Sequence, residues 1–454
     1  MNLAQRNLTD IQSYIEFLER NGDLMRVKSE VDAEYELAGI AKKYEGKKVI
    51  LFEKVKGSDY PVLIGLYWNR DILSRIFDTP SDELPFALAN DVKAWHTSPI
   101  APVVVKQGPA NEVVESEIDL YRLPIPLHSE LDGGRYLTSS VVIAKDPDTG
   151  VRNLSVHRMM VTGKNRFTLL LEELGHVMDY FKRAEAKGEP LEITVNNGID
   201  IPFLMAGASP ASAAPIDTDE TGIACAMRGE AVQLLESQTV GVEGVADAQF
   251  VIEGKILPNI REEEGPYAEV TGYYAGREPR WVCEVTAITR RKNPVFHSIL
   301  SGKEVRNAYA LGAGAGAFEK VHSQIPEVTA VHFSDACVPY HVVVQIDKTE
   351  EGIQHRAIQA TFDSLAFAKM VTVVDTDVDV YSLEDVEWAV ATRCQFENDL
   401  TLIDGIGHRL NPSVVDDKWT RLGLDATVPL PREQKFERAK TRDVNLDDYD
   451  IEGA

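Results

Sequence analysis

A series of short apolar segments between about residues 130 and 300 is the feature that most restricts how this chain can fold. Turn residues separate the segments, as in the DPDTG stretch at 146–150, so we expect antiparallel strands that follow one another closely. Strands of this kind form a barrel or a sandwich. One helix is expected among them, at about residues 172–187. The predicted strands read SSVVIAKD, RNLSVHRMMV, LEITVNNG, FVIEGKIL, WVCEVTAITRR and PVFHSIL.

The N-terminal flank alternates between helical and extended patterns. Asp10 is placed to cap a helix whose apolar residues recur at helical spacing. Short strands are expected at residues 48–53, 62–66 and 103–105. This flank is therefore predicted to form a lobe of mixed helix and strand.

The C-terminal flank contains nearly continuous apolar runs. HVVVQID and MVTVVD have the pattern of strands buried on both faces of a parallel sheet, and residues 357–369 fit a crossover helix between them. Ser382 and Asp385 form a capping-box pattern at the start of a further helix. The Gly/Ala-rich stretch 310–319 is expected to be a close-packed helix start or a loop.

These patterns predict three domains in a chain of 454 residues, which is too long for one small core. Residues 1–120 are predicted to form an N-terminal α/β lobe, and residues 121–315 a β-rich domain. Residues 316–454 are predicted to form a C-terminal α/β domain with a mainly parallel sheet and an extended, charged tail that docks on a neighbour or is partly disordered. The predicted fold class is mixed α/β and β.

The charge and the cysteines exclude several classes of function. A net charge of -25 disfavours nucleic acid or an anionic membrane as a partner. No apolar run reaches the roughly 20 residues that span a bilayer, and the N-terminus has no signal-peptide pattern. The four cysteines are widely spaced without a CxxC pair, which disfavours a zinc ribbon or a disulfide scaffold and favours a cytoplasmic location. They are Cys225, Cys283, Cys337 and Cys394.

The stretch IREEEGPYAEVTGYY at residues 260–274 is the first candidate for catalytic chemistry. Gly265 and Pro266 predict a turn of fixed shape that holds Glu264 and Glu269 on its two sides. Carboxylates held close together cannot all ionise easily, so one pKa should rise unless a cation compensates. The alternative interpretation is a solvated acidic loop.

A second group of polar residues lies upstream, in the predicted strand RNLSVHR. Asn153, Ser155 and His157 share one face of this strand, because side chains alternate along a strand with a period of two. Arg158 falls on the opposite face unless a bulge intervenes.

Two further residues complete a possible ligand set. His176 lies opposite the apolar stripe of its predicted helix, and Glu220 follows the small-residue loop ASPASAAP at 208–215. A lone histidine is more often structural or solvated than a ligand, and Glu220 by itself would be read as a surface acid. Asn153, His176 and Glu220 together would suit Mg²⁺ or Mn²⁺ better than zinc, and such ions often join a protein to a phosphorylated cofactor.

Five sequence motifs, found in one order along the chain, carry a resemblance to a known family. They are N-x-S-x-x-R (153–158), G-H (175–176), E-x-x-x-A-x-A-x-R-G (220–229), E-G-P-[FY]-x-E (264–269) and D-A-T-x-P (425–429). Through them the chain resembles the UbiD family of prenylated-flavin-dependent decarboxylases over nearly its full length. The resemblance implies that the central domain is a split β-barrel that binds flavin.

The resemblance also implies roles for individual residues. Arg158, Glu264 and Glu269 would form the catalytic Glu–Arg–Glu network. Asn153, His176 and Glu220 would hold a divalent metal, usually manganese, against the phosphate of prenylated FMN, and a potassium ion would lie near the loop at 208–210. The residues implied to bind the cofactor are Asn153, Ser155, Val156, His157, Arg158, Gly175, Ser209 and Glu220.

The chain departs from the family pattern in two places. Gly175 stands where the family often has Gln or Arg that contacts the cofactor, and Ala268 stands where Gly is common. A basic residue that assists the phosphate should lie in the C-terminal part, where Lys348, His355 and Arg356 are the candidates.

The activity implied is the reversible, non-oxidative decarboxylation of an α,β-unsaturated or (hetero)aromatic carboxylic acid. Glu269 would protonate the carbon that CO₂ leaves, Arg158 would pair with the substrate carboxylate or hold the acids in register, and Glu264 would orient Arg158. A flavin prenyltransferase would supply the cofactor, and the family would form homodimers or homohexamers. The alternatives are a conventional FMN-dependent oxidoreductase and a non-catalytic metal-binding assembly subunit.

Overall fold

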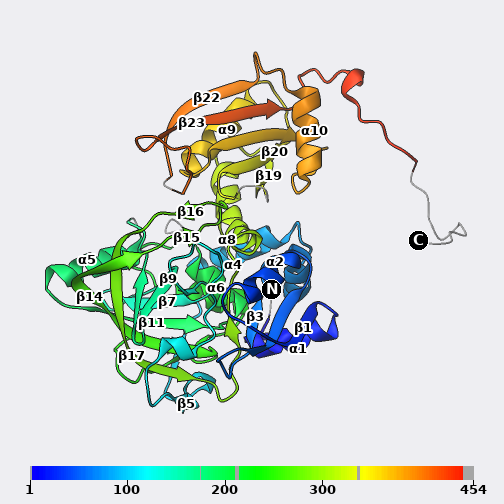
Figure 1. The fold of residues 1–454 in the computed structure, drawn as a ribbon. Helices are drawn as coiled ribbons and strands as arrows, with labels where there is room; N and C mark the ends of the chain where they lie inside the picture. Colours follow the sequence, from blue (N-terminus) through cyan, green and yellow to red (C-terminus); the bar gives the residue numbers. More distant parts are fainter. Residues whose placement is uncertain (1–2, 174, 210–213, 335–337, 409, 443–454) are drawn as a thin grey trace, which may run out of the picture.

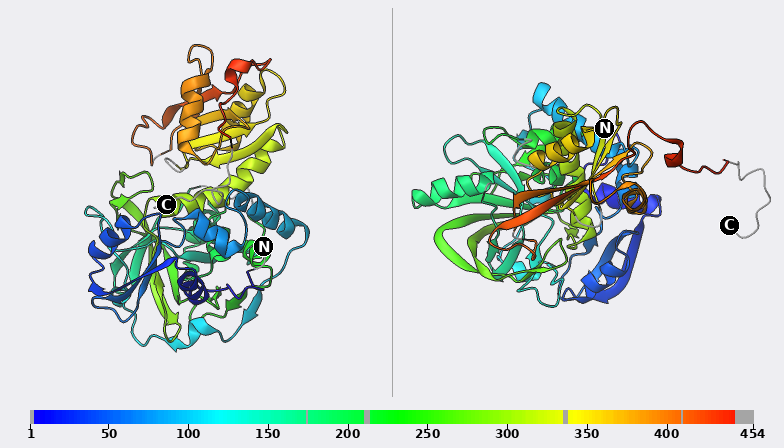
Figure 2. Two further views of the ribbon diagram at one scale, coloured as in Figure 1. Left: turned by 90° about the vertical axis from the view of Figure 1, so that its right-hand side faces the viewer. Right: turned by 90° about the horizontal axis from the view of Figure 1, so that it is seen from above.

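The computed structural model describes residues 3–173, 175–209, 214–334, 338–408 and 410–442. Figure 1 shows two bodies: the N-terminal body (residues 3–302) and the C-terminal body (residues 323–442), with helix α8 (Lys303–His322) running between them. The two turned views in Figure 2 keep the same division. Among the described helices, none is long and apolar enough to cross a membrane.

The first part of the N-terminal body carries a small sheet in the order β1-β2-β3-β18. The capping function predicted for Asp10 is confirmed, because its side chain accepts a hydrogen bond from the Ser13 N–H at the start of α1. The segment PVFHSIL was predicted to join the central sheet, and this is wrong: β18 pairs in parallel with β3 instead. The elements are α1 (Ile11–Arg20), β1 (Leu24–Val31), α2 (Glu36–Lys43), β2 (Val49–Val55), β3 (Val62–Ile64), α3 (Arg70–Phe77), α4 (Leu84–Thr97), β4 (Val103–Val105) and β18 (Phe296–His297).

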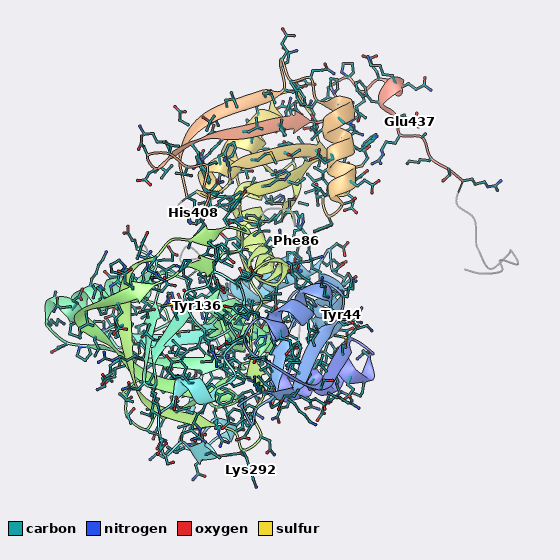
Figure 3. The ribbon with its side chains drawn as sticks, in the orientation of Figure 1. Tyr44, Phe86, Tyr136, Lys292, His408 and Glu437 are labelled. Carbon is teal, nitrogen blue, oxygen red and sulfur yellow. The ribbon has the colours of Figure 1, made fainter. Side chains whose placement is uncertain are left out.

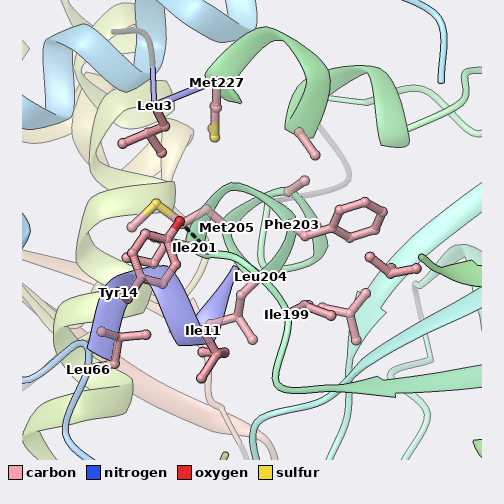
Figure 4. Close-up of a cluster of buried hydrophobic side chains, with 14 of the residues drawn as sticks. Leu3, Ile11, Tyr14, Leu66, Ile199, Ile201, Phe203, Leu204, Met205 and Met227 are labelled. Atoms are coloured by element: carbon pink, nitrogen blue, oxygen red, sulfur yellow. Dashed lines mark hydrogen bonds between the residues drawn. The ribbon is translucent and has the colours of Figure 1, made fainter. Parts of the chain in front are cut away.

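Helix α1 packs on the central part of the chain rather than on its own sheet alone. The Tyr14 hydroxyl accepts a hydrogen bond of 3.3 Å from the Ile201 N–H at the start of helix α6 (Figure 4). Ile11, Tyr14 and Leu18 are fully buried, and burial of each such side chain contributes roughly 1.5–3 kcal/mol. The two parts of the N-terminal body therefore share one hydrophobic core.

The central part forms a nine-stranded sheet in the order β6-β9-β10-β17-β14-β11-β7-β8, with β5 paired to β17. Its long hairpin, β14 with β17, supplies the middle of the sheet. The other strands pair antiparallel around it, as predicted. The strands are β5 (Val113–Val114), β6 (Tyr136–Leu137), β7 (Val141–Lys145), β8 (Arg152–Val156), β9 (Met159–Gly163), β10 (Arg166–Leu169), β11 (Leu191–Asn197), β14 (Phe250–Glu264) and β17 (Glu278–Arg290).

The segment RNLSVHRMMV was predicted to be one strand, and the structure divides it in two. β8 ends at Val156 and β9 begins at Met159, and the two strands lie near opposite ends of the sheet order. A two-residue link spans at most about 11 Å. The sheet must therefore curve until its ends approach each other, although no ladder among the described strands joins β6 to β8 and closes a barrel.

Three helices, rather than the single one predicted, lie among these strands: α5 (His176–Ala186), α6 (Ile201–Gly207) and α7 (Thr221–Arg228). Every residue of α6 is buried, so it has no polar face and shows no helical periodicity in the sequence. Its start was marked only by Asp200, whose side chain accepts from the Phe203 N–H, and by Pro202 in the first turn. Smaller elements are β12 (Gln233–Leu235), β13 (Gly244–Val245), β15 (Tyr267–Ala268) and β16 (Tyr274–Ala275).

The C-terminal body is a five-stranded sheet in the order β19-β20-β21-β23-β22. The two continuous apolar runs, β20 and β21, pair in parallel, and helix α9 connects them along the chain, as predicted. β21 is also parallel to β23. The outer strands are antiparallel to their neighbours, so the sheet is mixed and the prediction of a mainly parallel sheet is wrong. The elements are β19 (Val328–Phe333), β20 (His341–Ile346), α9 (Ile353–Ser364), β21 (Met370–Asp375), α10 (Leu383–Arg393), β22 (Leu400–Ile406) and β23 (Lys418–Ala426).

The Gly/Ala-rich stretch 310–319 lies inside helix α8 and is neither a helix start nor a loop. It lies against both bodies: a Cβ added at Gly312 would be in van der Waals contact with the Ala208 carbonyl oxygen, and one added at Gly314 with the Phe333 ring, each at 3.9 Å. Glycine lowers helix propensity, so tertiary packing rather than propensity stabilises this segment.

The two bodies also touch outside α8. Phe86 and His408 lie on either side of the junction in Figure 3. The Tyr381 hydroxyl donates to the Asp82 carbonyl oxygen at 3.1 Å, and the Thr271 hydroxyl donates to the Leu410 carbonyl oxygen at 3.3 Å. Arg438 ties the tail to the C-terminal body through its ion pair with Asp385, and residues 443–454 lie outside the described residues.

Candidate active site

Arg158 lies in the two-residue link between β8 and β9, where the ends of the curved sheet approach each other. Its guanidinium donates two hydrogen bonds to Glu264, from Nε to Oε1 at 3.0 Å and from Nη2 to Oε2 at 2.8 Å. The third donor, Nη1, contacts Glu269 Oε1. Of the two alternatives, a raised carboxyl pKa or a compensating cation, the structure shows the cation, and it contacts both carboxylates. Strand β8 ends at Val156, so side chains no longer alternate between the two faces of the sheet at Arg158, and Arg158 does not have to point away from Asn153 and Ser155.

The two glutamates differ in exposure. Glu264 is the last residue of β14, and its side chain is 0% exposed, whereas the Glu269 side chain keeps 12% exposure. Glu269 belongs to the 265–277 loop of the β14–β17 hairpin, in which β15 and β16 pair. Gly265 has φ of +100°, and a Cβ on it would lie 2.4 Å from the Gly276 carbonyl oxygen, so this turn requires glycine. The solvated-loop interpretation is wrong for Glu264.

Two tyrosines surround this group. The Tyr136 hydroxyl donates to Glu264 Oε1 at 2.8 Å, and the Arg158 guanidinium lies over the Tyr267 ring at 5.1 Å. Burial, followed by the charge of Glu264, raises the pKa of Tyr136, so it remains a hydrogen-bond donor. Tyr136 lies well inside the N-terminal body (Figure 3). Tyr267 was visible in the EGPYAE motif, but no sequence signal connected Tyr136 to the acidic turn.

Asn153, His176 and Glu220 are brought together from β8, α5 and the residue before α7. Asn153 Nδ2 lies 2.7 Å from Glu220 Oε2 and 3.3 Å from His176 Nδ1, and His176 Nδ1 lies 3.4 Å from Glu220 Oε1. Glu220 is buried, unlike the surface acid its sequence suggested, and it also accepts a hydrogen bond of 2.6 Å from the Leu154 N–H. Arg152 of β8 pairs with Asp219 at 2.8 Å, which holds β8 next to Glu220.

This group fits a divalent cation. The Asn153 amide oxygen is buried without a hydrogen-bond partner among the described residues, and a bound cation would satisfy it. Burial raises the pKa of Glu220, and its contacts with His176, Leu154 and Asn153 oppose the rise. A carboxylate, an imidazole and an amide oxygen are ligands that Mn²⁺ and Mg²⁺ accept.

The other residues implied to bind a cofactor lie at the end of β8, just after it, and just before α5. His157 Nδ1–H donates to the Leu170 carbonyl oxygen at 2.8 Å, so the Ser155 hydroxyl, 2.9 Å away, donates to Nε2. Burial lowers the pKa of His157 to about 4, which keeps the ring neutral. Val156, at the end of β8, is exposed, and Gly175 immediately precedes α5.

The loop proposed for potassium is described only in part. Ser209 follows α6, and its hydroxyl donates to the Met205 carbonyl oxygen at 3.1 Å. Pro210 lies outside the described residues. Gly207 lies just before the loop. A Cβ added to it would lie 3.0 and 3.2 Å from the two Cγ atoms of Val141, so α6 packs closely against the sheet at this point.

The three basic candidates for a phosphate contact all lie in the C-terminal body. Lys348 Nζ is buried against Thr427, Val428 and Glu351, the carboxylate being 2.9 Å away. Arg356 pairs with Glu350, and His355 is exposed beside it on α9. Lys348 therefore joins the segment before α9 to residues 427–428, whereas the Arg356–Glu350 pair is an exposed local contact.

Comparison with known proteins shows the family of the chain. The N-terminal, Rift-related and C-terminal domain models of 3-octaprenyl-4-hydroxybenzoate carboxy-lyase (UbiD) match residues 15–92, 103–304 and 309–426. A protein encoded in the cooM 5' region of Rhodospirillum rubrum is 45% identical, covering 99% of this chain and 98% of its own length. Anhydromevalonate phosphate decarboxylase of Methanothermobacter thermautotrophicus is 33% identical (93% and 98% covered), and gallate decarboxylase of Lactiplantibacillus plantarum 30% (90% and 92%).

Solved structures agree with the sequence matches. The UbiD-class enzyme HmfF from Pelotomaculum thermopropionicum in complex with FMN has a TM-score of 0.92 and 38% identity, covering 97% of this chain and 100% of its own. An evolved dimeric form of HmfF in complex with prenylated FMN (prFMN) has a TM-score of 0.88 and 36% identity, covering 97% and 100%. From its three matched domains and its near full-length relatives, the chain belongs to the UbiD family of carboxy-lyases.

Proposed function

We propose that the protein catalyses the reversible, non-oxidative decarboxylation of an α,β-unsaturated or (hetero)aromatic carboxylic acid with prenylated FMN as its cofactor. The observation that carries this proposal is Arg158 held between a fully buried glutamate and a partly exposed one. The family supports the reaction class, the decarboxylases of gallate and of anhydromevalonate phosphate support the range of acids, and the HmfF complexes support the flavin.

The two glutamates are suited to different tasks. Glu264 uses both oxygens on Arg158 and one also on Tyr136, so it fixes the orientation of the guanidinium. Glu269 uses one oxygen on Arg158 and retains exposure, so it can meet a substrate and protonate the carbon that CO₂ leaves. Arg158 pairs with the substrate carboxylate or holds the acids in register. A bound prenylated flavin would supply the electron sink that loss of CO₂ requires.

The cofactor would be held by two kinds of contact. Asn153, His176 and Glu220 would bind Mn²⁺ or Mg²⁺, which would neutralise the flavin phosphate, and K⁺ would lie near Ser209. The remaining contacts would come from Ser155, Val156, His157 and Gly175. A flavin prenyltransferase would be needed to supply the group.

Cofactor loading and turnover test this proposal together. The protein is produced with a flavin prenyltransferase, purified without oxygen, and examined by absorbance and by the mass of the released cofactor. A panel of cinnamate-like, hydroxybenzoate and heteroaromatic acids is then screened for CO₂ release and for exchange of ¹³CO₂ into the carboxylate. We expect prenylated FMN and turnover of at least one acid. Plain FMN together with NAD(P)H oxidation would instead identify an oxidoreductase.

We further propose that the protein forms a homodimer or a homohexamer through its C-terminal body. β22 is an edge strand, and Leu400, Leu402 and Ile406 are exposed on one of its faces together with Asp404. Exposed apolar side chains on an edge strand favour association. The evolved dimeric form of HmfF supports self-association.

A further inference from the structure

Asp132 lies in a turn at residues 129–134 that packs directly against the turn carrying Glu269. The two turns are so close that a Cβ on Gly133 would lie 2.1 Å from the Gly265 carbonyl oxygen. The Gly133 N–H donates to the Pro266 carbonyl oxygen at 2.7 Å, which fixes the separation between the turns.

The Asp132 carboxylate connects the two turns. Its Oδ1 accepts a hydrogen bond of 2.8 Å from the Ala268 N–H, and its Oδ2 accepts one of 3.0 Å from the Ser129 N–H. Ala268 immediately precedes Glu269, whose own N–H donates to the Tyr273 carbonyl oxygen at 2.8 Å. Hydrogen bonds therefore fix the backbone N–H groups of both Ala268 and Glu269.

Asp132 also contributes charge. It lies close enough to Arg158 for their charges to interact, so a third carboxylate joins Glu264 and Glu269 near one guanidinium. Burial raises the pKa of Asp132, while the N–H groups of Ala268 and Ser129 and the charge of Arg158 oppose this rise.

We propose that Asp132 is a positioning residue of the proposed decarboxylase: it holds the backbone of the Glu269 turn so that the Glu269 carboxyl stays in register with Arg158. This inference rests on the proposed function of Glu269. It predicts an effect on turnover without an effect on substrate affinity, because Asp132 acts through the turn rather than on the substrate.

Asp132→Asn tests the proposal in the flavin-loaded protein. An asparagine amide group offers one acceptor oxygen, so one of the two N–H groups faces a donor and loses its partner. Since a displacement of about 1 Å can cost about 100-fold in rate, we expect kcat to fall about 10- to 100-fold, with KM changed less than about threefold. Hydrogen exchange followed by mass spectrometry should quicken in peptides covering 265–275 and stay unchanged elsewhere.

Asp146→Asn is the control for neutralising a carboxylate in a turn: Asp146 Oδ1 accepts the N–H groups of Asp148 and Thr149, and the carboxylate also pairs with Arg183. Its turn carries no residue of the site, so kcat should stay at the wild-type level. If Asp132→Asn does not accumulate as folded protein, Asp132→Glu keeps the charge but changes the reach, and the same loss is expected.

The outcomes separate this inference from the proposed function. If the wild-type protein turns over an acid and Asp132→Asn has the same kcat, the positioning role is overturned and the proposed function stands. Unchanged exchange in 265–275 also overturns it, because Asp132 would then not hold the turn. A flavin-loaded wild-type protein that decarboxylates no acid overturns the proposed function itself, and the positioning role with it.

Discussion

At the scale of single residues, the proposed reaction depends on the acid group of Glu269. Replacing it by Gln keeps the volume of the side chain and removes the proton it can give. General acid catalysis contributes about 10²–10⁴-fold in rate, so we expect Glu269→Gln to lose at least about 100-fold in turnover. Turnover, flavin content and melting temperature of the loaded variant check this, and only turnover should change.

Glu263→Gln is the control for this substitution, because Glu263 is an exposed neighbour on β14. It should retain wild-type turnover. If Glu269→Gln were to work at a near-normal rate with full cofactor, the acid would be another group, and Glu264 is the first to test.

The residues of the site differ in how far the sequence could predict them. Arg158, Glu264 and Glu269 stand in recognisable motifs, and the sequence left two alternatives for the acids, a raised pKa or a compensating cation. Asp132 and Tyr136 were not predicted, because their link to the acidic turn exists only after residues 128 to 136 apart in sequence have met in the fold. A hydrogen bond to a distant backbone N–H has no signature in local spacing.

A buried histidine gives the molecule a predictable sensitivity to acid. Burial lowers the pKa of His341 on β20 to about 4, below the ordinary value of 6.5. The unfolded chain therefore binds more protons between pH 6.5 and 4, and stability is lost as the pH falls through that window. His341→Gln should weaken this dependence by on the order of 2 kcal/mol between pH 7 and 5, measured by urea unfolding.

The glutamine can still bond the Thr372 hydroxyl, which His341 Nε2 contacts at 3.0 Å, so stability at pH 7 should change little. The exposed His355→Gln serves as the control and should leave the pH dependence as it is in the wild type. An unchanged slope in His341→Gln would mean that the ring is not kept neutral by burial.

At the scale of elements, the contact between the turns 129–134 and 265–269 is the tightest feature of the site. In Gly133→Ala the new Cβ would lie 2.1 Å from the Gly265 carbonyl oxygen, so the turns must move apart. We expect a loss of turnover of about 100-fold, since the displacement needed is about 1 Å. Gly39→Ala, in α2 with open space at its Cβ position, should retain activity. Full activity in Gly133→Ala would show that the turns can separate without cost.

Element types were more predictable than element pairings. Periodicity identified most strands because alternation and continuous apolar runs are local properties. It could not show that β18 joins the N-terminal sheet, that β8 and β9 separate at His157, or that the outer strands of the C-terminal sheet run antiparallel. Each of these depends on which strands meet, and α6 was missed because a fully buried helix has no amphipathic pattern.

At the scale of the whole molecule, the C-terminal body presents the surface for the proposed self-association. Ile403 of β22 packs against the core, whereas Leu402 and Ile406 are 67% and 78% exposed on the other face of the same strand. β22 pairs only with β23 among the described strands, so its outer edge is unpaired. A second copy that covers this strand would bury the apolar side chains and satisfy the backbone together.

The double substitution Leu402→Asp, Ile406→Asp tests this surface. Charged groups cannot be buried there without partners, so we expect the assembly to dissociate to monomers in light scattering coupled to size exclusion. Because the changes lie on an exposed face, the melting temperature at high dilution should stay close to that of the wild type. Leu383→Asp, a 44% exposed residue on α10, controls for the loss of surface hydrophobicity and should leave the assembly intact. A double variant that keeps the wild-type mass would place the interface elsewhere on the chain, because the two new carboxylates, on either side of Asp404 on one strand face, would repel a symmetric partner.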